Sequence, residues 1–211
     1  MANVKGPDGK SDRKSRAAET RRRMLDAAIA CFTDSGYAAT TMAAIAEEAG
    51  VAVQTLYFTF HTKAELLQET FDRAVLGDGP PVPPSEAEWY KAMEAAPSIE
   101  GALGHLVSGV TEILERVAPL RPVFEAAAGE EGVAQVWKRG EQLRLHGYRS
   151  IIEILAKKQS LSDAHDPESA TDVLMVLLGP DTFRAFTQER QWSLEPWKSW
   201  VAGVLERELF Q

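Results

Sequence analysis

Residues 40–63 read TTMAAIAEEAGVAVQTLYFTFHTK, a stretch with two short helical patterns on either side of a glycine. Thr41 precedes the first pattern, at the position where a side-chain hydroxyl caps a helix. We expect that helix to cover residues 42–49, because Gly50 then breaks it. Residues 53–60 predict the second short helix. The buried positions of the first helix are expected to be Met42, Ile45, Ala46 and Ala49.

Helical spacing continues on both sides of this stretch. Upstream, one face of a longer helix is expected to hold Met24, Ala28, Cys31 and Phe32. Gly36 ends that helix, as a glycine after the last helical turn commonly does. Downstream, Thr62 is followed three residues later by Glu65, which predicts a capping box that opens a fourth helix running through Val75.

The order helix, turn, helix around Ala49-Gly50-Val51 is the pattern of a helix-turn-helix unit, whose turn needs a small residue. In such a unit the helix after the turn lies in the DNA major groove, with its first residues at the base edges. Gln54 can pair with adenine through two hydrogen bonds, and Val53 or Thr55 can contact a thymine methyl group. The predicted base-reading set is Ala52, Val53, Gln54 and Thr55.

Hydroxyl and ammonium groups around this helix are suited to phosphate contacts, which fix the register of a protein on DNA. The predicted set is Thr40, Thr41, Tyr57, Thr59, Thr62 and Lys63. Ile45, Ala46, Leu56 and Phe60 are expected to form the core beneath them. For Tyr57, simple packing is the alternative to a phosphate contact.

Residues 23–67 resemble, without a gap, the N-terminal domain of the tetracycline-repressor (TetR) family of bacterial transcription regulators. The matching positions are Ala27-Ala28, Phe32, Gly36-Tyr37, Thr40-Thr41, Ile45-Ala46, Ala49-Gly50-Val51, Leu56-Tyr57, Phe60 and Lys63. The resemblance implies that Thr40 and Thr41 cap the second helix and contact phosphate, and that Tyr57 and Lys63 bind the DNA backbone. It also implies a base-reading role for residues 52–55. Two positions depart from the family: Ala52 replaces a frequent Ser or Thr, and Thr59 replaces a frequent His or Tyr.

The charge distribution fits a DNA-binding end on an acidic body. The chain has 211 residues and a net charge of −8, yet residues 1–23 hold eight basic and three acidic residues. That segment is therefore +5 and the rest of the chain −13. Such asymmetry is typical of a basic arm. We expect residues 1–15 to form a flexible basic arm, with a solvated tail as the alternative for residues 1–12.

The rest of the sequence predicts an all-α protein with a second helical domain. We expect a DNA-binding domain with its connecting helix at 16–76, a proline-rich linker at 77–85, and a helical domain for effector binding and dimerisation at 86–211. No window shows the alternation of a strand. Motifs from Leu177 to Trp200 resemble the final helices of an actinobacterial-like subgroup of the family. In the family, the last two long helices of each subunit pair in the dimer. Here those helices are expected within residues 166–190 and 196–210.

The family resemblance also implies a small-molecule cavity in the second domain. The candidate lining residues are large aromatic side chains and two histidines: Trp89, Tyr90, His105, Phe124, Trp137, His146, Tyr148 and Phe183, with Phe186 as a further aromatic candidate. Aromatic residues at helical spacing form cores as well as cavities, so both roles stay open for each of them.

Other classes of protein fit the sequence less well. Catalytic spacings such as HExxH and GxSxG do not occur, and one Cys excludes a disulfide framework or a multi-cysteine zinc site. Cys31 is expected to be an inert thiol rather than a redox sensor. We therefore predict a cytoplasmic, homodimeric repressor without cofactor or metal, released from a palindromic operator by a small molecule. A transcriptional activator, a ligand-independent DNA-binding protein and a helical protein–protein module are the alternatives.

Overall fold

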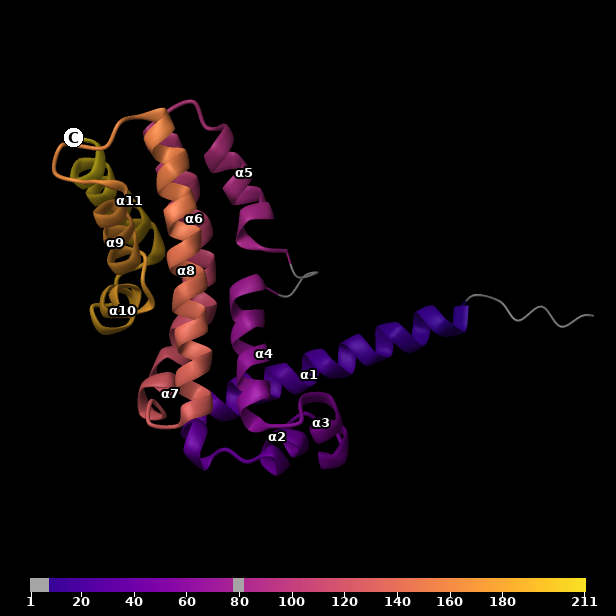
Figure 1. The fold of residues 1–211 in the computed structure, drawn as a ribbon. Coiled ribbons are helices and arrows are strands. Elements are labelled where there is room, and N and C mark those ends of the chain that lie inside the picture. The colour runs from indigo at the N-terminus through magenta and orange to yellow at the C-terminus, as the bar shows by residue number, and fades with distance from the viewer. Residues whose placement is uncertain (1–7, 78–81) are drawn as a thin grey trace, which may run out of the picture. The chain divides into compact units, whose positions relative to one another are not determined.

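The computed structural model describes residues 8–77 and 82–211, and all regular structure in these residues is helical (Figure 1). This confirms the predicted all-α class. The helices are α1 (Asp8–Ala39), α2 (Met42–Glu48), α3 (Val53–Phe60), α4 (Lys63–Leu76), α5 (Glu88–Ala95), α6 (Ile99–Val117), α7 (Arg121–Ala126), α8 (Glu131–Lys158), α9 (Pro167–Leu177), α10 (Pro180–Arg184) and α11 (Leu194–Phe210). Within the described residues, no helix is long and apolar enough to cross a membrane.

The chain divides into two compact units, with the boundary inside α4 between Thr70 and Phe71. The domain boundary expected from the sequence lay after residue 76. The difference arises because Phe71 packs on aromatic rings of the second unit, so the last turns of α4 belong to that unit. Of the predicted arm, residues 1–7 lie outside the described residues, whereas residues 8–15 are part of α1.

The first unit contains the helix-turn-helix. Gly36 has φ 76° and interrupts α1, as expected, although one further turn follows up to Ala39. Thr41 caps α2 by accepting a hydrogen bond from the Ala44 amide at 3.1 Å. Gly50 has φ 64° and forms the turn between α2 and α3, a conformation that favours glycine. The two short helices thus begin and end where local sequence signals predict.

Buried side chains fix the position of α3 in this unit. Leu56 and Phe60, one helical turn apart, are almost completely buried, as are the four predicted positions of α2. At the upstream end of the unit, the Arg23 guanidinium donates a hydrogen bond to the Ala49 carbonyl at 3.0 Å. This contact ties α1 to the turn before α3.

The second unit is built around two long helices. α6 lies between α5 and α11, and α8 runs beside α6 and packs on α9 (Figure 1). The core between them is aliphatic, and the buried side chains include Leu106, Val110, Ile152, Leu174 and Leu205. A 3₁₀ turn at Pro84–Glu86 precedes α5. Of the predicted linker, residues 78–81 lie outside the described residues.

The helix expected within residues 166–190 is interrupted. α9 ends at Leu177, and Gly179 leads into α10, which begins at Pro180. Proline lacks an amide hydrogen and cannot continue a helix that precedes it. A π-helical turn, Ala185–Glu189, then follows α10. The predicted single helix is therefore three short segments, whereas the expected helix at 196–210 is present as α11.

Candidate nucleic-acid interface and cavity

The first turn of α3 presents the predicted base-reading residues to solvent. Ala52, Gln54 and Thr55 are exposed and Val53 is half-buried. No side chain caps the N-terminus of α3, since the N-cap residue is Ala52. The burial of Leu56 and Phe60 fixes which face of the helix points outward. The arrangement matches what a groove-reading helix requires, and the base contacts of these four residues stay a prediction.

Thr41 and Tyr57 are also placed where a ligand can reach them. The Thr41 side chain is exposed while its hydroxyl oxygen caps α2. Tyr57 is 50% exposed, with no aromatic partner among the described residues. Thr59 is half-buried and its hydroxyl donates to the Thr55 carbonyl at 2.8 Å. Thr62 caps α4 by accepting a hydrogen bond from the Glu65 amide, which is one of the two bonds of the predicted capping box.

Thr40 has a different role from the predicted phosphate contact. Its side chain is only 3% exposed, and its hydroxyl donates to the carbonyls of Gly36 at 2.7 Å and Cys31 at 2.9 Å. A single hydroxyl hydrogen is shared between these two acceptors inside the protein. The Thr40 hydroxyl therefore holds the end of α1 and is not presented to DNA.

Lys63 is likewise engaged within the first unit. Its Nζ donates to the carbonyls of Tyr37 at 2.7 Å and Thr40 at 3.0 Å, and lies 4.1 Å from the centre of the Tyr37 ring. An ammonium group has three hydrogens, so one is left for a phosphate. Lys63 thus braces the connection between α1 and α2, a role that the sequence did not indicate.

Phe58 is a residue that sequence reasoning missed. Its side chain is 86% exposed, which is exceptional for phenylalanine. It lies on the same exposed side of α3 as Gln54 and Tyr57. The signal was present in the sequence, because residues 56 and 60 define the buried face and residue 58 is rotated away from both. An exposed aromatic beside the first turn of α3 enlarges the surface that this helix presents.

Several arginines of the basic N-terminal cluster have partners inside the first unit. Arg21 pairs with Glu69 at 2.6 Å, and its guanidinium lies 4.7 Å from the centre of the Phe60 ring. Arg22 pairs with Glu19 and Asp26 on its own helix. These contacts show that part of the basic cluster stabilises α1 and its packing on α3.

Cys31 is half-buried in α1. Desolvation, followed by the negative charges of Glu48 and Asp34, raises the pKa of its thiol. A raised pKa lowers the thiolate fraction, and the thiolate is the reactive form. The environment is therefore that of a poorly reactive thiol.

The second unit contains a cavity of about 740 Å³, which is in the range of small-molecule sites. Its walls come from the end of α4 and from α5, α6 and α8, and are mainly aliphatic and aromatic. Five of the eight candidate residues line it: Trp89, Tyr90, Trp137, His146 and Tyr148. The structure thus brings most of the predicted aromatic residues together around one space.

Three candidates do not line this cavity. His105 is exposed on α6. Phe124 is buried and packs against Phe71 and Trp137, behind the cavity wall. Phe183 is buried against Trp197, whereas Phe186 is half-buried and contacts both Trp197 and Trp200. Phe124 and Phe183 are core residues, because their rings fill the space between helices.

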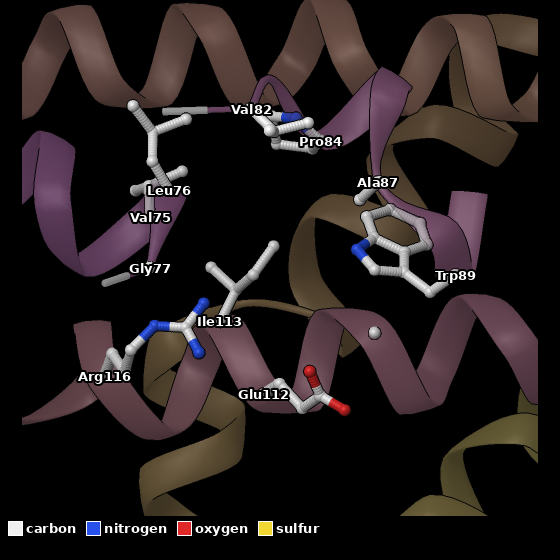
Figure 2. A pocket seen from close by; sticks show the side chains of 11 residues that line it. Val75, Leu76, Gly77, Val82, Pro84, Ala87, Trp89, Glu112, Ile113 and Arg116 are labelled. Atoms are coloured by element: carbon white, nitrogen blue, oxygen red, sulfur yellow. The ribbon is translucent and has the colours of Figure 1, made fainter. Parts of the chain in front are cut away.

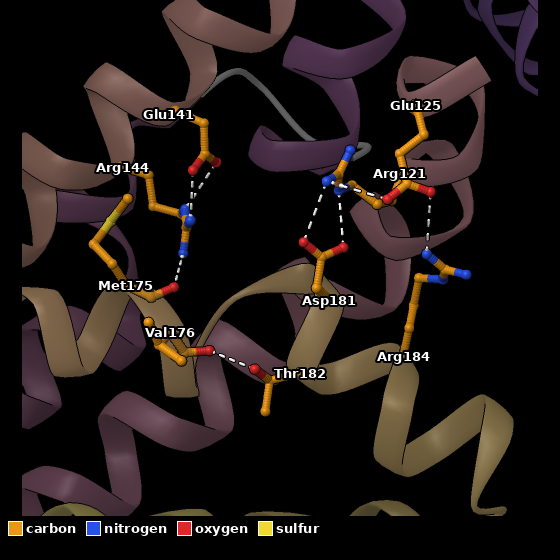
Figure 3. A network of polar contacts seen from close by, with 9 residues as sticks. All are labelled: Arg121, Glu125, Glu141, Arg144, Met175, Val176, Asp181, Thr182 and Arg184. Atoms are coloured by element: carbon orange, nitrogen blue, oxygen red, sulfur yellow. Dashed lines mark hydrogen bonds and ion pairs between the residues drawn. The ribbon is translucent and has the colours of Figure 1, made fainter. Parts of the chain in front are cut away.

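Charged groups at the cavity occur as matched pairs. Arg139 pairs with Asp72 at 3.2 Å, and Arg144 forms two hydrogen bonds with Glu141, at 2.7 and 3.2 Å (Figure 3). Each pair is electrically neutral, so these groups give this cavity no net charge. A neutral, mainly apolar space favours a mainly apolar ligand.

Two cavity-lining residues of α8 also bind the end of α9. Arg144 donates through Nη1 to the Met175 carbonyl at 2.8 Å (Figure 3), and the Tyr148 hydroxyl donates to the Leu178 carbonyl at 2.9 Å. Burial raises the pKa of Tyr148 to about 12. These bonds satisfy carbonyls that the end of a helix leaves without partners.

A second polar network joins α7 to α10. Arg121 forms two hydrogen bonds with Asp181, and its guanidinium lies 4.6 Å from the centre of the Trp137 ring. Glu125 bridges Arg121 and Arg184 (Figure 3). A cavity-wall tryptophan is thereby connected to the segment that follows α9.

The geometry of the first unit defines a helix-turn-helix domain of the kind that DNA-binding proteins carry. Residues 24–70 match the family described as "Bacterial regulatory proteins, tetR family". The first unit is thus similar to the DNA-binding domain of bacterial transcriptional regulators of this family.

Individual proteins agree with this assignment. The chain is 46% identical over 59 residues to the HTH-type transcriptional regulator TtgR of Pseudomonas putida, covering 28% of each protein. The fold is similar to that of NalD, the secondary repressor of the MexAB-OprM multidrug efflux pump in Pseudomonas aeruginosa. That match has a TM-score of 0.67 and 18% identity, and covers 92% of this chain and 97% of NalD. The SmeT–triclosan complex matches with a TM-score of 0.68 and 18% identity over 92% of each chain.

The family match covers residues 24–70, which lie in the first unit. The aligned segment spans about 28% of TtgR, whereas the structural matches extend over both units. The comparisons thus establish the DNA-binding type of domain from sequence and the overall helical architecture from the fold.

Proposed function

We propose that the protein is a homodimeric transcriptional repressor that binds a palindromic operator and leaves it when a small molecule occupies the second unit. The observation that carries this proposal is the exposed first turn of α3, held by Leu56 and Phe60 after the Gly50 turn. Helices presented in this way enter the major groove. Repression and a cytoplasmic location are the usual properties of regulators in this family.

Within this proposal, residues 52–55 read base edges while Thr41, Tyr57 and the third hydrogen of Lys63 contact phosphates. Base contacts supply the sequence specificity, and phosphate contacts supply much of the affinity. Thr59, which is half-buried, lies at the edge of the proposed DNA-contact surface and adds to its contact with DNA. Phe58 extends the contact surface with an apolar ring.

A dimer is required because one eight-residue helix makes few base contacts. Two-fold symmetry doubles these contacts, with half-sites about 34–36 Å apart. The surface proposed for dimerisation is formed by α9, α10 and α11, in keeping with the pairing of the last two long helices in the family. Val176 of α9 is 65% exposed there, and Trp192, in the loop that leads into α11, is 37% exposed. Apolar side chains with this exposure are suited to an intersubunit contact.

The cavity of about 740 Å³ is proposed as the effector site. SmeT, whose fold is similar, is described in complex with the small molecule triclosan. An effector can shift the protein away from DNA only by binding one conformation more tightly than another. We expect the conformation favoured by the effector to place the two α3 helices out of register with successive major grooves.

The test is selection of binding sites from a library of random DNA duplexes with the full-length protein. We expect an enriched inverted repeat whose half-sites are about 10 base pairs apart, centre to centre. The double variant Gln54→Ala with Thr55→Ala is the matched control and should not enrich that repeat. The proposal would be contradicted if the wild-type protein enriched no sequence relative to the starting library. Placing the selected repeat before a reporter gene then separates repression from activation.

A further inference from the structure

The second unit has another cavity of about 250 Å³ next to the larger one. Five residues line both spaces: Val75, Leu76, Pro84, Trp89 and Ile113. Figure 2 shows the smaller space, with Trp89 at one end and Arg116 at the other. The shared lining residues place the two cavities side by side, as neighbouring compartments of the second unit.

Trp89 stands between the two compartments and is positioned by Gly109 of α6. A Cβ atom at Gly109 would lie 2.1 Å from Cγ of Trp89, far inside van der Waals contact. Only glycine allows the indole to lie this close to the α6 backbone. The position of the ring, and with it the division of the space, is therefore set by the local sequence of α6.

The smaller compartment has two charged lining residues, Glu112 and Arg116, one turn apart on α6. Both side chains point into the compartment (Figure 2). Arg116 donates through Nε to the Ala74 carbonyl at 2.8 Å, which fixes the guanidinium and leaves its Nη groups facing the space. Among the described residues, no ion pair joins Glu112 to Arg116 or to another side chain.

This electrostatic arrangement discriminates between head groups. A carboxylate in the compartment would be attracted by Arg116 and repelled by Glu112. An ammonium group would be attracted by Glu112 and repelled by Arg116. A neutral carboxamide can accept a hydrogen bond from the guanidinium through its oxygen and donate one to the carboxylate through its nitrogen. It satisfies both charges without adding a third.

We propose that the two compartments form one binding site for an elongated neutral molecule with an apolar chain and a carboxamide head group. The chain lies in the larger compartment, among apolar side chains and internally neutralised ion pairs. The head group lies between Glu112 and Arg116. This inference rests on the proposed function, since the same region is the proposed effector site, and it names the chemical class of the effector.

The experiment is calorimetric titration of the full-length protein with three probes of equal chain length: decanamide, decanoate and decylamine. Hydrogen bonds to charged but solvent-exposed groups should make decanamide bind about fivefold more tightly than either ion. Glu112→Gln should strengthen decanoate binding, because the repulsion is removed. Arg116→Gln should strengthen decylamine binding for the corresponding reason, and Arg116→Lys, which keeps the charge, should preserve the wild-type order.

Glu115→Gln is the matched control, since Glu115 is exposed on the same helix and lines neither compartment. It should leave the order of the three probes unchanged. Equal affinities for all three probes, a preference for either ion, or no binding of any probe would overturn the inference. DNA binding measured on the same preparations separates the two proposals. If DNA binding is intact but the probe preference is absent, this inference alone is overturned. If the probe preference is present but DNA binding is absent, the regulator function alone is overturned.

Discussion

Two phenylalanines in α3, at positions 58 and 60, have opposite environments. Phe60 is 1% exposed and anchors the helix in the first unit, whereas Phe58 is 86% exposed. The stability of the folded domain depends on the Phe60 ring, whereas the Phe58 ring forms part of the domain's exposed surface. Substitutions at these two positions therefore separate stability from binding.

We predict that Phe58→Ala changes the free energy of unfolding by less than about 0.5 kcal/mol, as surface substitutions usually do. The same variant should bind the operator more weakly, because the exposed ring is lost from the contact surface. Phe60→Ala should instead cost roughly 3–5 kcal/mol of stability. Urea denaturation and DNA titration measure the two effects. Unchanged operator affinity for Phe58→Ala would exclude its role in DNA binding.

Gln54→Ala should reduce discrimination at a single base pair by roughly 1–3 kcal/mol, with little change elsewhere in the site. The measurement is competition binding against operators that differ at one position each. Gln135→Ala, at an exposed glutamine of α8, serves as the control and should leave every competition value unchanged. A uniform loss on all sequences would instead make Gln54 a contact to the DNA backbone.

Tyr148 gives a prediction of pH dependence. Burial raises the pKa of its phenol to about 12, above its ordinary value of 10. The folded state therefore favours the protonated phenol, so its contribution to stability is complete below pH 10 and is lost as the pH rises through 12. Two pKa units correspond to about 2–3 kcal/mol.

Urea denaturation between pH 9 and 12 tests this contribution. The wild-type protein should lose more stability over this interval than Tyr148→Phe, which lacks the titrating group. Tyr57→Phe, at an exposed tyrosine, should behave like the wild type. Parallel curves for the wild type and Tyr148→Phe would show that the Tyr148 phenol does not titrate differently on folding.

At the scale of elements, α6 contains two glycines in contrasting surroundings. A Cβ at Gly109 would overlap the Trp89 ring, whereas a Cβ at Gly104 would meet no atom within 4 Å. We predict that Gly109→Ala destabilises the protein by about 1–3 kcal/mol through overpacking. Gly104→Ala should stabilise it by up to about 1 kcal/mol, since alanine favours the helix. Equal effects in thermal unfolding would contradict the close packing of Trp89 on α6.

The helix ends of the first unit could be predicted from the sequence because local chemistry decides them. Thr41, Gly50 and Thr62 act within three or four residues of themselves, and the structure places each at the expected end. The roles of Thr40 and Lys63 could not be predicted in the same way. The carbonyls that they bind are set by the packing of α1, α2 and α4, which sequence spacing does not encode.

The second unit was less predictable for a related reason. Aromatic residues at helical spacing indicate a buried helix face. They do not show whether that face packs against other side chains or borders a cavity. Phe124 and Phe183 fill such space, whereas Trp137 and Tyr148 border a cavity. The interruption after α9 did carry a local signal, the Gly179-Pro180 pair, which should have divided the helix expected within residues 166–190.

At the scale of the whole molecule, the proposed dimer gives a further prediction. Val176→Glu places a charge on the proposed contact surface of α9, where burial of an unpaired carboxylate is costly. We expect the variant to sediment as a monomer at concentrations where the wild type is a dimer, and to lose operator binding with it. Leu145→Glu, at an exposed leucine of α8, is the control. A dimeric Val176→Glu variant would exclude this surface.

Sequence-specific DNA binding by the exposed turn of α3 is the property on which the proposed function depends. Its most direct test is fluorescence anisotropy with a labelled duplex from the region upstream of the protein's own gene, against a scrambled duplex, at two salt concentrations. We predict tight binding to the first duplex that weakens steeply with salt, because phosphate contacts release counterions. Weak and equal binding of both duplexes at both salt concentrations, together with failure to select a site from random DNA, would contradict the account.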